Sequence, residues 1–255
     1  MARLSAGFLI AILLAGSARA DWTVTSSQTE RAATGGVEHR RAVATESGNA
    51  DRAILELALF SPRSTTLRAI DNPSGGDSLA DVIQREHCLA GVNGGYFDPE
   101  DKPVGLLISD GKLIAPLRKA RLLSGMMIVS NGRVQLLRLA EYSPRRNATT
   151  ALQCGPFLVD RGQPVPGLNE TRSARRTFIV TAGSERVGIG YCSEVTLAQL
   201  GKILATSGLA PDLKVQRALN LDGGSSSAFG FAGERGLFSI PEQKTVRNFV
   251  VVAPK

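Results

Sequence analysis

The chain has 255 residues, of which 43% are apolar and 21% are charged. This composition is typical of a globular protein and excludes a collagen, a long coiled coil and a mostly disordered chain. Only two histidines occur, His39 and His87, which leaves almost nothing from which to build a zinc hydrolase or a histidine-dependent triad. The formal net charge of +7 favours anionic ligands but also fits an ordinary basic protein, and no nucleic-acid-binding motif accompanies it.

The first twenty residues are typical of a secretory signal peptide. Arg3 precedes an uncharged, mostly aliphatic run at residues 6–16, and small residues follow at Ala18 and Ala20. The run is shorter than the ~20 residues that a membrane-spanning helix needs. We therefore expect cleavage after Ala20 and export of the mature protein, to the periplasm or out of the cell, without stable insertion in a membrane.

Residues 21–50 are polar and weakly patterned. They are predicted to form an N-terminal extension with one short strand at residues 38–44. Neither an internal repeat nor a low-complexity linker interrupts residues 51–255, which are therefore predicted to form one domain.

The regular elements of that domain are predicted from hydrophobic patterning and turn residues. Asp-Gly at 110–111 and Asn-Gly at 131–132 supply the positive φ angles of tight turns, so a hairpin is expected around each. Thr196 and Gln199 form a capping box that opens a helix ending near residue 208. The other expected elements are strands at 53–60, 88–92, 157–159, 177–181, 187–191, 217–221 and 246–253, and a helix at 78–86 capped by Asp77 or Ser78. The pattern predicts the α+β class: a single domain of mixed, largely antiparallel β-sheet with two or three helices.

Three cysteines follow the predicted signal peptide. Export favours a disulfide, and the odd number leaves one thiol free. Cys154 lies in an apolar strand and Cys192 ends the strand at 187–191, so we predict a bridge between these two, with Cys88 buried and free. No histidine is placed to activate any of the three, which argues against a catalytic cysteine.

Two segments share one design, in which an apolar strand ends in a polar residue followed by two glycines. They are Asn93-Gly94-Gly95 and Asp222-Gly223-Gly224. Consecutive glycines let the backbone approach a ligand closely and turn N–H groups toward an anion, although either segment alone could be an ordinary tight turn. A polar side chain at a strand end is held rigidly, as a catalytic group must be.

The two segments also carry a resemblance to a known family. Asn93-Gly94-Gly95-Tyr96-Phe97, Arg176-Thr177 and Asn220-Leu221-Asp222-Gly223-Gly224-Ser225-Ser226 resemble, in that order, the motifs of the phosphodiester glycosidases. The resemblance extends from about residue 53 to the C-terminus and includes Gln153-Cys154-Gly155-Pro156 and Val246-Arg247-Asn248. It implies an enzyme that hydrolyses a sugar 1-phosphodiester bond.

The residues suit that reaction. The leaving group is a phosphate monoester, which needs little help from a general acid, so the main requirements are a carboxylate at the anomeric carbon and positive charge on the phosphate. Asp222 is expected to be the carboxylate, as nucleophile or as base for water. Arg176, or Arg175, is expected to bind the phosphate, and Asn93 a sugar hydroxyl or a phosphate oxygen. The other residues expected to bind substrate are Gly94, Gly95, Gly223, Gly224, Ser225 and Asn248.

The sequence predicts a sugar-phosphate or glycan partner, no nucleic acid, and no cofactor. A divalent cation remains open, because Asp98, Glu100 and Asp101 could bind one, although an exposed acidic loop is the simpler interpretation. Residues 225–227 are three serines, but they lack the Gly-x-Ser-x-Gly pattern of serine hydrolases. The alternative function is a non-catalytic protein of carbohydrate binding, or of envelope or exopolysaccharide assembly.

Overall fold

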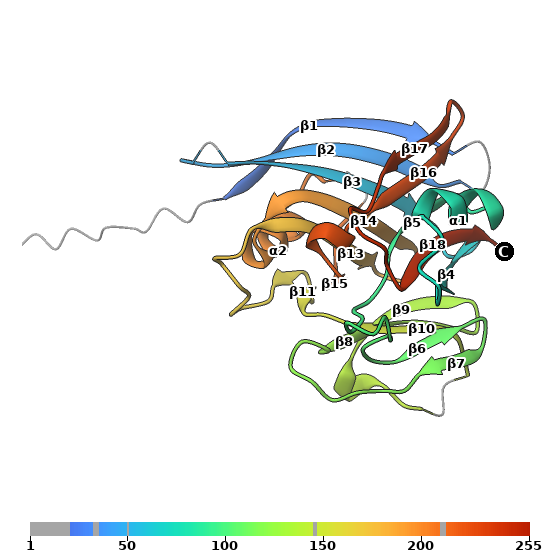
Figure 1. The fold of residues 1–255 in the computed structure, drawn as a ribbon. Helices are drawn as coiled ribbons and strands as arrows, with labels where there is room; N and C mark the ends of the chain where they lie inside the picture. The colour runs from blue at the N-terminus through green and yellow to red at the C-terminus, as the bar shows by residue number, and fades with distance from the viewer. Residues whose placement is uncertain (1–20, 33–35, 50, 145–146, 210–212) are drawn as a thin grey trace, which may run out of the picture.

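The structure is a computed structural model that describes residues 21–32, 36–49, 51–144, 147–209 and 213–255 (Figure 1). The predicted signal peptide, residues 1–20, lies outside the described residues. None of the helices formed by the described residues is long and apolar enough to cross a membrane.

The strands form three sheets, and all the strand pairs within them are antiparallel. The first sheet has eight strands in the order β1-β2-β3-β14-β13-β15-β11-β12. Its strands are β1 (Trp22–Arg31), β2 (Glu38–Glu46), β3 (Arg52–Phe60), β11 (Phe157–Asp160), β12 (Gln163–Pro164), β13 (Ala174–Ala182), β14 (Arg186–Val195) and β15 (Arg217–Asn220).

The other two sheets have five strands each, in the orders β7-β6-β10-β8-β9 and β17-β16-β5-β18-β4. The sheet with the order β7-β6-β10-β8-β9, called the small sheet below, lies at the bottom of Figure 1, away from β1 and β2. It contains β6 (Leu107–Ser109), β7 (Lys112–Ala115), β8 (Gly125–Ser130), β9 (Arg133–Arg138) and β10 (Ala148–Cys154). The other sheet, called the third sheet below, contains β4 (Thr65–Asp71), β5 (Ala90–Asn93), β16 (Phe229–Gly233), β17 (Gly236–Ile240) and β18 (Asn248–Pro254).

Two short α-helices accompany the sheets, α1 (Leu79–Arg85) and α2 (Leu197–Ala205), together with the 3-10 turns η1 (Leu139–Glu141) and η2 (Gly224–Ser226). Both α-helices start with a capping box, at Ser78 and at Thr196, because each side chain accepts a hydrogen bond from the backbone three residues on. The expectation of largely antiparallel sheet with two helices is confirmed. The fold is more dominated by β-structure than an even α+β mixture.

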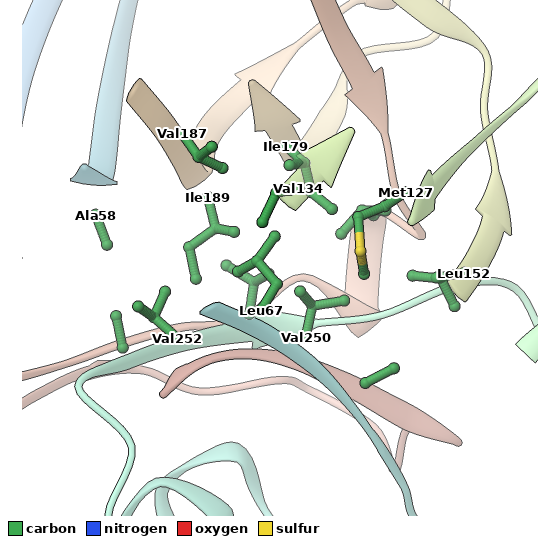
Figure 2. Close-up of a cluster of buried hydrophobic side chains, with 14 of the residues drawn as sticks. Ala58, Leu67, Met127, Val134, Leu152, Ile179, Val187, Ile189, Val250 and Val252 are labelled. Atoms are coloured by element: carbon green, nitrogen blue, oxygen red, sulfur yellow. The ribbon is translucent and has the colours of Figure 1, made fainter. Parts of the chain in front are cut away.

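The three sheets share one core. Apolar side chains from each sheet meet in a single buried cluster (Figure 2). Ile179 comes from the eight-stranded sheet, Met127 from the small sheet, and Val250 from the third. α2 covers the outer face of the eight-stranded sheet, and α1 covers the outer face of the third sheet. The antiparallel strands therefore bury both faces in the middle of the molecule, which holds their ends in fixed positions.

The N-terminal segment differs from its prediction. Instead of one short strand at 38–44, it forms the two long strands β1 and β2, and β2 pairs along its length with β3. The eight-stranded sheet thus runs across the boundary predicted at residue 50. β1 is polar and largely exposed, so its sequence lacks the apolar alternation by which a half-buried strand is identified.

The predicted disulfide is wrong in this structure. Cys88, Cys154 and Cys192 are all free and buried. Cys154 packs in the core shared by the sheets, whereas Cys192 packs in the separate cluster beneath α2. The two thiols belong to different layers, and burial raises the pKa of Cys154 to about 12 and that of Cys88 to about 11.

The turn predictions are confirmed at both hairpins. Asp110 and Gly111, and likewise Asn131 and Gly132, adopt positive φ between β6 and β7 and between β8 and β9. The predictions missed β4 and the β16–β17 hairpin. The latter closes at Gly233 and Gly236 without an Asp-Gly or Asn-Gly pair, so no strong turn motif marks it in the sequence.

Candidate functional site

The two glycine segments meet in space although they lie in different sheets. Asn93 ends β5, and Asp222 follows β15 by two residues. The Asn93 side-chain amide donates to the backbone carbonyl of Asp222 at 2.8 Å, and the Asp222 N–H donates to the carbonyl of Gly94 at 3.1 Å. The structure therefore brings together the two segments that the sequence predicted to share a site.

Asn93 holds this junction together. Its side-chain oxygen accepts from the Thr177 hydroxyl at 2.7 Å and from the Ala228 N–H at 3.1 Å. The residue is 1% exposed. Asn93 therefore positions the Asp222 segment, and its contact with a sugar hydroxyl or a phosphate oxygen stays a prediction.

Asn248, at the start of β18, accepts hydrogen bonds from the backbone N–H groups of two of the glycines. The Gly94 N–H donates to its backbone carbonyl at 2.8 Å, and the Gly95 N–H donates to its side-chain oxygen at 2.7 Å. A Cβ at Gly94 would lie 1.9 Å from that oxygen, so only glycine fits here. These two amides are therefore not turned toward a phosphate, contrary to the sequence interpretation.

The second pair of glycines shapes the turn that carries Asp222. The Gly223 N–H donates to the Asp222 carboxylate at 2.9 Å. A Cβ at Gly223 would lie 3.0 Å from the carbonyl oxygen of Arg175, and Gly224 has a φ of +65°. The close carbonyl disfavours a side chain at position 223, and the positive φ favours glycine at position 224. Ser225 is exposed, and its carbonyl accepts from the N–H of Gln243 at 2.7 Å.

The Asp222 carboxylate is partly buried, and none of the described cations forms an ion pair with it. Burial raises its pKa above the ordinary value of an aspartate. The Ser226 hydroxyl and the Gly223 N–H oppose that rise, and so do the positive charges of Lys244 and Arg172. A desolvated carboxylate influenced by cations that do not neutralise it is typical of a catalytic group.

Arg176 is buried behind the Asp222 turn. Its Nε donates to the carbonyl of Val195 at 2.9 Å, and one Nη donates to the carbonyl of Arg172 at 2.5 Å. Its other Nη lies 3.8 Å from the position that a Cβ on Gly223 would take. Burial, together with the charge of Arg172, lowers the pKa of Arg176. Two of its nitrogens thus hold backbone, and one nitrogen remains on the side of the Asp222 turn.

Arg175 also binds backbone. One Nη donates to the carbonyl of Ser227 and to that of Pro241, the latter at 2.9 Å. Its guanidinium lies 5.4 Å from the ring centroid of Tyr191, in a cation–π contact. Neither arginine of the predicted phosphate clamp is therefore a freely exposed cation.

The exposed cations at the site are two residues that the sequence analysis did not assign, Arg172 and Lys244. Both are exposed, lack an ion pair with any described residue, and lower the pKa of Asp222. The N–H of Arg172 donates to the Asn169 side chain at 2.8 Å, which fixes the turn. Arg172 belongs to a basic cluster that is visible in the sequence, whereas nothing in the sequence marked Lys244.

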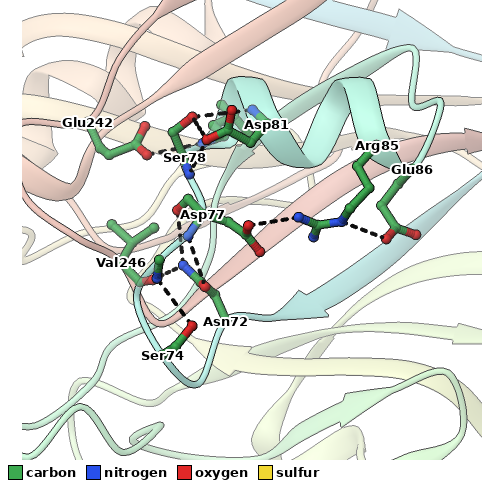
Figure 3. Close-up of polar contacts among 11 residues, drawn as sticks. Asn72, Ser74, Asp77, Ser78, Asp81, Arg85, Glu86, Glu242 and Val246 are labelled. Atoms are coloured by element: carbon green, nitrogen blue, oxygen red, sulfur yellow. Dashed lines mark hydrogen bonds and ion pairs between the residues drawn. The ribbon is translucent and has the colours of Figure 1, made fainter.

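The loop that carries Lys244 is tied down on both sides, as Figure 3 shows. Before it, the Glu242 carboxylate accepts from the N–H of Leu79, at the start of α1, at 3.0 Å. After it, the carbonyl of Val246 accepts from the Asn72 side chain at 2.9 Å. The Lys244 ammonium lies 4.8 Å from the ring centroid of Phe97. These contacts keep the lysine near Asp222.

A hydrogen-bond network lies beneath the carboxylate. The Tyr96 hydroxyl donates to the carbonyl of Gly155 at 2.6 Å, and the Asn220 amide donates to the same carbonyl at 3.0 Å. Burial is the main cause that raises the pKa of Tyr96, and the negative charge of Asp222 contributes. The tyrosine is therefore a neutral donor that supports the loop at residue 155.

Several buried polar atoms around the site have no hydrogen-bond partner among the described residues. They are Asn220 Oδ1, Ser227 Oγ, Asn248 Nδ2 and Arg175 Nε. Buried polar atoms of folded proteins are nearly always paired, so each of these departs from the rule. Their concentration around η2 marks a region whose polar groups the protein itself leaves unsatisfied.

The described residues contain no cluster of three or more metal-ligating side chains. One cavity, of about 590 Å³, lies where the β8–β9 hairpin faces the turn between β13 and β14. Its lining does not include Asn93, Arg176 or Asp222. The candidate site is defined here by its charges and its unsatisfied polar groups.

A family model described as phosphodiester glycosidase matches residues 86–253, a stretch that contains Asn93, Arg176, Asp222 and Asn248. No curated protein sequence matches the chain.

Solved structures share the fold at low sequence identity. The zebrafish N-acetylglucosamine-1-phosphodiester alpha-N-acetylglucosaminidase catalytic domain, auto-inhibited by its pro-peptide, is 15% identical with a TM-score of 0.61, covering 94% of this chain and 86% of its own. A hypothetical protein from Synechocystis is 15% identical with a TM-score of 0.60, covering 90% of this chain, which in turn spans 64% of that protein. A candidate exported protein from Burkholderia pseudomallei is 12% identical with a TM-score of 0.57, covering 82% of this chain and 75% of its own.

Proposed function

This chain belongs to the phosphodiester glycosidase family, and on that basis we propose that it hydrolyses the bond between the anomeric carbon of a sugar and a phosphodiester oxygen. The observation that carries the proposal is Asp222, a partly buried carboxylate with a raised pKa and exposed cations nearby. The family supplies the class of bond, and Asp222 is the group that we propose acts on it.

Asp222 acts at the anomeric carbon, as a nucleophile or as a base for water. Departure of the phosphate monoester needs little protonation, because the second ionisation of a phosphate monoester lies near pH ~6. The positive charge that builds on the sugar ring in the transition state is stabilised by the carboxylate. The ionised form of Asp222 is therefore the active one.

Arg172 and Lys244 attract the phosphate. Both are exposed and lie close enough to Asp222 to influence its ionisation, so an anionic group between them and the carboxylate would contact positive charge. Arg176 supports this arrangement from behind by holding the carbonyl of Arg172. Asn93 and Asn248 act as positioning residues that fix the two glycine turns.

The substrate class follows the same reasoning. The name of the zebrafish structure specifies an N-acetylglucosamine 1-phosphodiester as the substrate of that protein. For this chain we propose the broader class of sugar 1-phosphodiesters. The unpartnered polar atoms around η2 give the site additional hydrogen-bonding capacity for sugar hydroxyls or ordered water.

A direct test is a screen of chromogenic sugar 1-phosphodiesters of several sugars, with and without a chelator. Release of the phosphate-linked chromophore from at least one sugar supports the proposal, and loss of that release with chelator would add a metal requirement. Binding of the same compounds without release, measured by calorimetry, would instead support the non-catalytic carbohydrate-binding or assembly function.

Export is part of the proposed function and rests on the leader at residues 1–20. The Burkholderia structure named as a candidate exported protein is consistent with it. Mass spectrometry of the mature protein should find Asp21 as the N-terminal residue. A chain that still starts at Met1 after purification from its native host would contradict export by cleavage.

A further inference from the structure

The exposed large hydrophobic side chains of the described residues are concentrated in one short stretch. They are Leu113, Leu117 and Leu122, with exposed fractions of 60%, 38% and 62%. Leu113 lies on β7, and the other two lie in the loop between β7 and β8. A group of exposed leucines in one segment marks an interaction surface more strongly than leucines scattered singly.

The same stretch is strongly basic. Lys112, Arg118, Lys119 and Arg121 alternate with the leucines, and residues 112–123 contain no aspartate or glutamate. All four cations are exposed, and no described residue forms an ion pair with any of them. We call residues 112–122 the basic leucine surface.

The basic leucine surface is held in place by one buried glutamine. Gln153, 1% exposed, accepts from the Arg118 N–H at 3.1 Å and donates to the Arg118 carbonyl at 2.6 Å. It also donates to the carbonyl of Leu123 at 3.2 Å, and the Leu123 side chain is buried. The loop therefore presents its leucines and cations from a fixed backbone rather than from a loose tip.

This surface adjoins the candidate site along the chain. β10 carries Gln153 and ends at Cys154, and the next residue, Gly155, accepts the hydrogen bonds of Tyr96 and Asn220. A Cβ on Gly155 would lie 2.4 Å from the carbonyl oxygen of Leu122. The loop and the network beneath Asp222 thus contact the same few residues.

We propose that the basic leucine surface docks the protein on an anionic phospholipid bilayer. The cations match the headgroup phosphates, and the leucines enter the boundary between headgroups and acyl chains. A water-soluble polyanion would satisfy the arginines and lysines but would leave the leucines in water. Exposed leucines and unpaired cations in one segment therefore favour a lipid surface over an acidic polysaccharide or nucleic acid.

Docking on a bilayer also narrows the substrate. A surface that adjoins the candidate site would place it near lipid headgroups, which favours a phosphodiester whose second substituent is a lipid. This consequence rests on the proposed function, whereas the docking itself depends only on the surface.

The test is co-sedimentation with vesicles, without any substrate, so its outcome is independent of enzymatic activity. Vesicles of equal parts phosphatidylglycerol and phosphatidylcholine should bind the protein, and pure phosphatidylcholine vesicles should not. The triple change Arg118→Gln, Lys119→Gln and Arg121→Gln should weaken binding roughly a hundredfold, because each cation near an anionic membrane contributes about a factor of five. Leu113→Ser, Leu117→Ser and Leu122→Ser together should weaken it by at least about tenfold, because apolar burial is lost.

A matched control removes three exposed cations elsewhere, by Arg31→Gln, Arg52→Gln and Arg161→Gln. It should change binding by less than about threefold, because distant charges are screened by salt. Absence of binding by the unmodified protein, or an equal loss in the control, overturns the proposal. Full binding by the leucine variant, checked by its melting temperature and by the single change Leu122→Ser, would identify the surface as a reader of charge alone and would also overturn it.

Discussion

The two ends of β15 differ in whether their charged side chains form ion pairs. At its start, Arg217 pairs with Glu141 at 2.5 Å and lies 3.3 Å from Asp160, which also pairs with Arg138 at 2.9 Å. Just past its other end, Asp222 has no ion pair with a described residue. Both ends are built from the same residue types.

The difference separates structural from functional charge. Where the charges are paired, they stabilise the fold, and Arg217 lowers the pKa of Glu141 to about 2. Where they are left unpaired, the protein gives up stability, and this is expected at a site that must bind and react. Substitutions at the paired end should accordingly lower stability, whereas substitutions at the Asp222 end should lower the rate of the reaction.

The largest expected effect is that of Asp222→Asn. The change keeps size and hydrogen-bonding reach but removes the negative charge, so kcat should fall at least about a thousandfold. The melting temperature should stay the same or rise. Because the pKa of Asp222 is raised in the fold, its stabilising contribution is present at low pH and lost as pH rises through that pKa, so a neutral side chain is favoured near pH 7. An Asn variant that retains near-normal turnover would place the chemistry elsewhere.

Arg176→Lys should affect both measurements. Lysine cannot reach the carbonyls of Val195 and Arg172 together, so buried acceptors lose a donor and unfolding free energy should fall by about 2 kcal/mol. The turn at Arg172 would loosen, and kcat/KM should fall by roughly tenfold to a hundredfold. Assays below the lowered melting temperature separate the two effects. Unchanged stability would contradict the role of Arg176 as a positioning residue.

The exposed cations should act on substrate affinity. The double change Arg172→Gln and Lys244→Gln should raise KM by roughly tenfold, because the charges that attract phosphate are gone. The kcat/KM of this variant should also depend on salt concentration far less than that of the unmodified protein. The melting temperature should not change, since neither cation is in an ion pair with a described residue. Cationic and neutral glycosides serve as control substrates. If the double variant loses as much kcat/KM with a neutral glycoside as with the phosphodiester, the two cations do not recognise phosphate.

The acid limb of the profile of kcat/KM against pH should lie at a higher pH than the usual pKa of an aspartate. Burial raises the pKa of Asp222, and the ionised form is the active one, so the rate is full above that pKa and falls with each unit below it. In the double cation variant the limb should move further up, because Arg172 and Lys244 both lower this pKa. A limb that stays in place in that variant would mean that another group titrates.

The smallest effect on rate should come from Asp160→Asn, which makes the same chemical change at the paired end. It leaves Arg138 and Arg217 beside a neutral amide and should reduce unfolding free energy by about 1–2 kcal/mol. The melting temperature should drop by several degrees, and kcat should stay within about twofold of the unmodified protein. If Asp160→Asn loses as much turnover as Asp222→Asn, the contrast between a structural and a catalytic end of β15 is wrong.

The sequence by itself determined the local features of this protein. Turn residues such as Asp110 and Asn131, and the helix caps Ser78 and Thr196, act within about four residues, so their patterns predict structure directly. The strand-end design of Asn93 and Asp222 likewise predicted that a polar group would follow each strand. Their motifs also identified the family, which the match over residues 86–253 confirms.

Only the tertiary structure decided which distant groups meet. Asn248 binds the amide of Gly95 across 153 residues, and the tie of Leu79 to Glu242 spans 163 residues. No local pattern encodes such contacts, because they result from three sheets closing around a common core. The same packing separated Cys154 from Cys192, engaged the guanidinium of Arg176 with backbone, and left Arg172 and Lys244 as the exposed charges near Asp222.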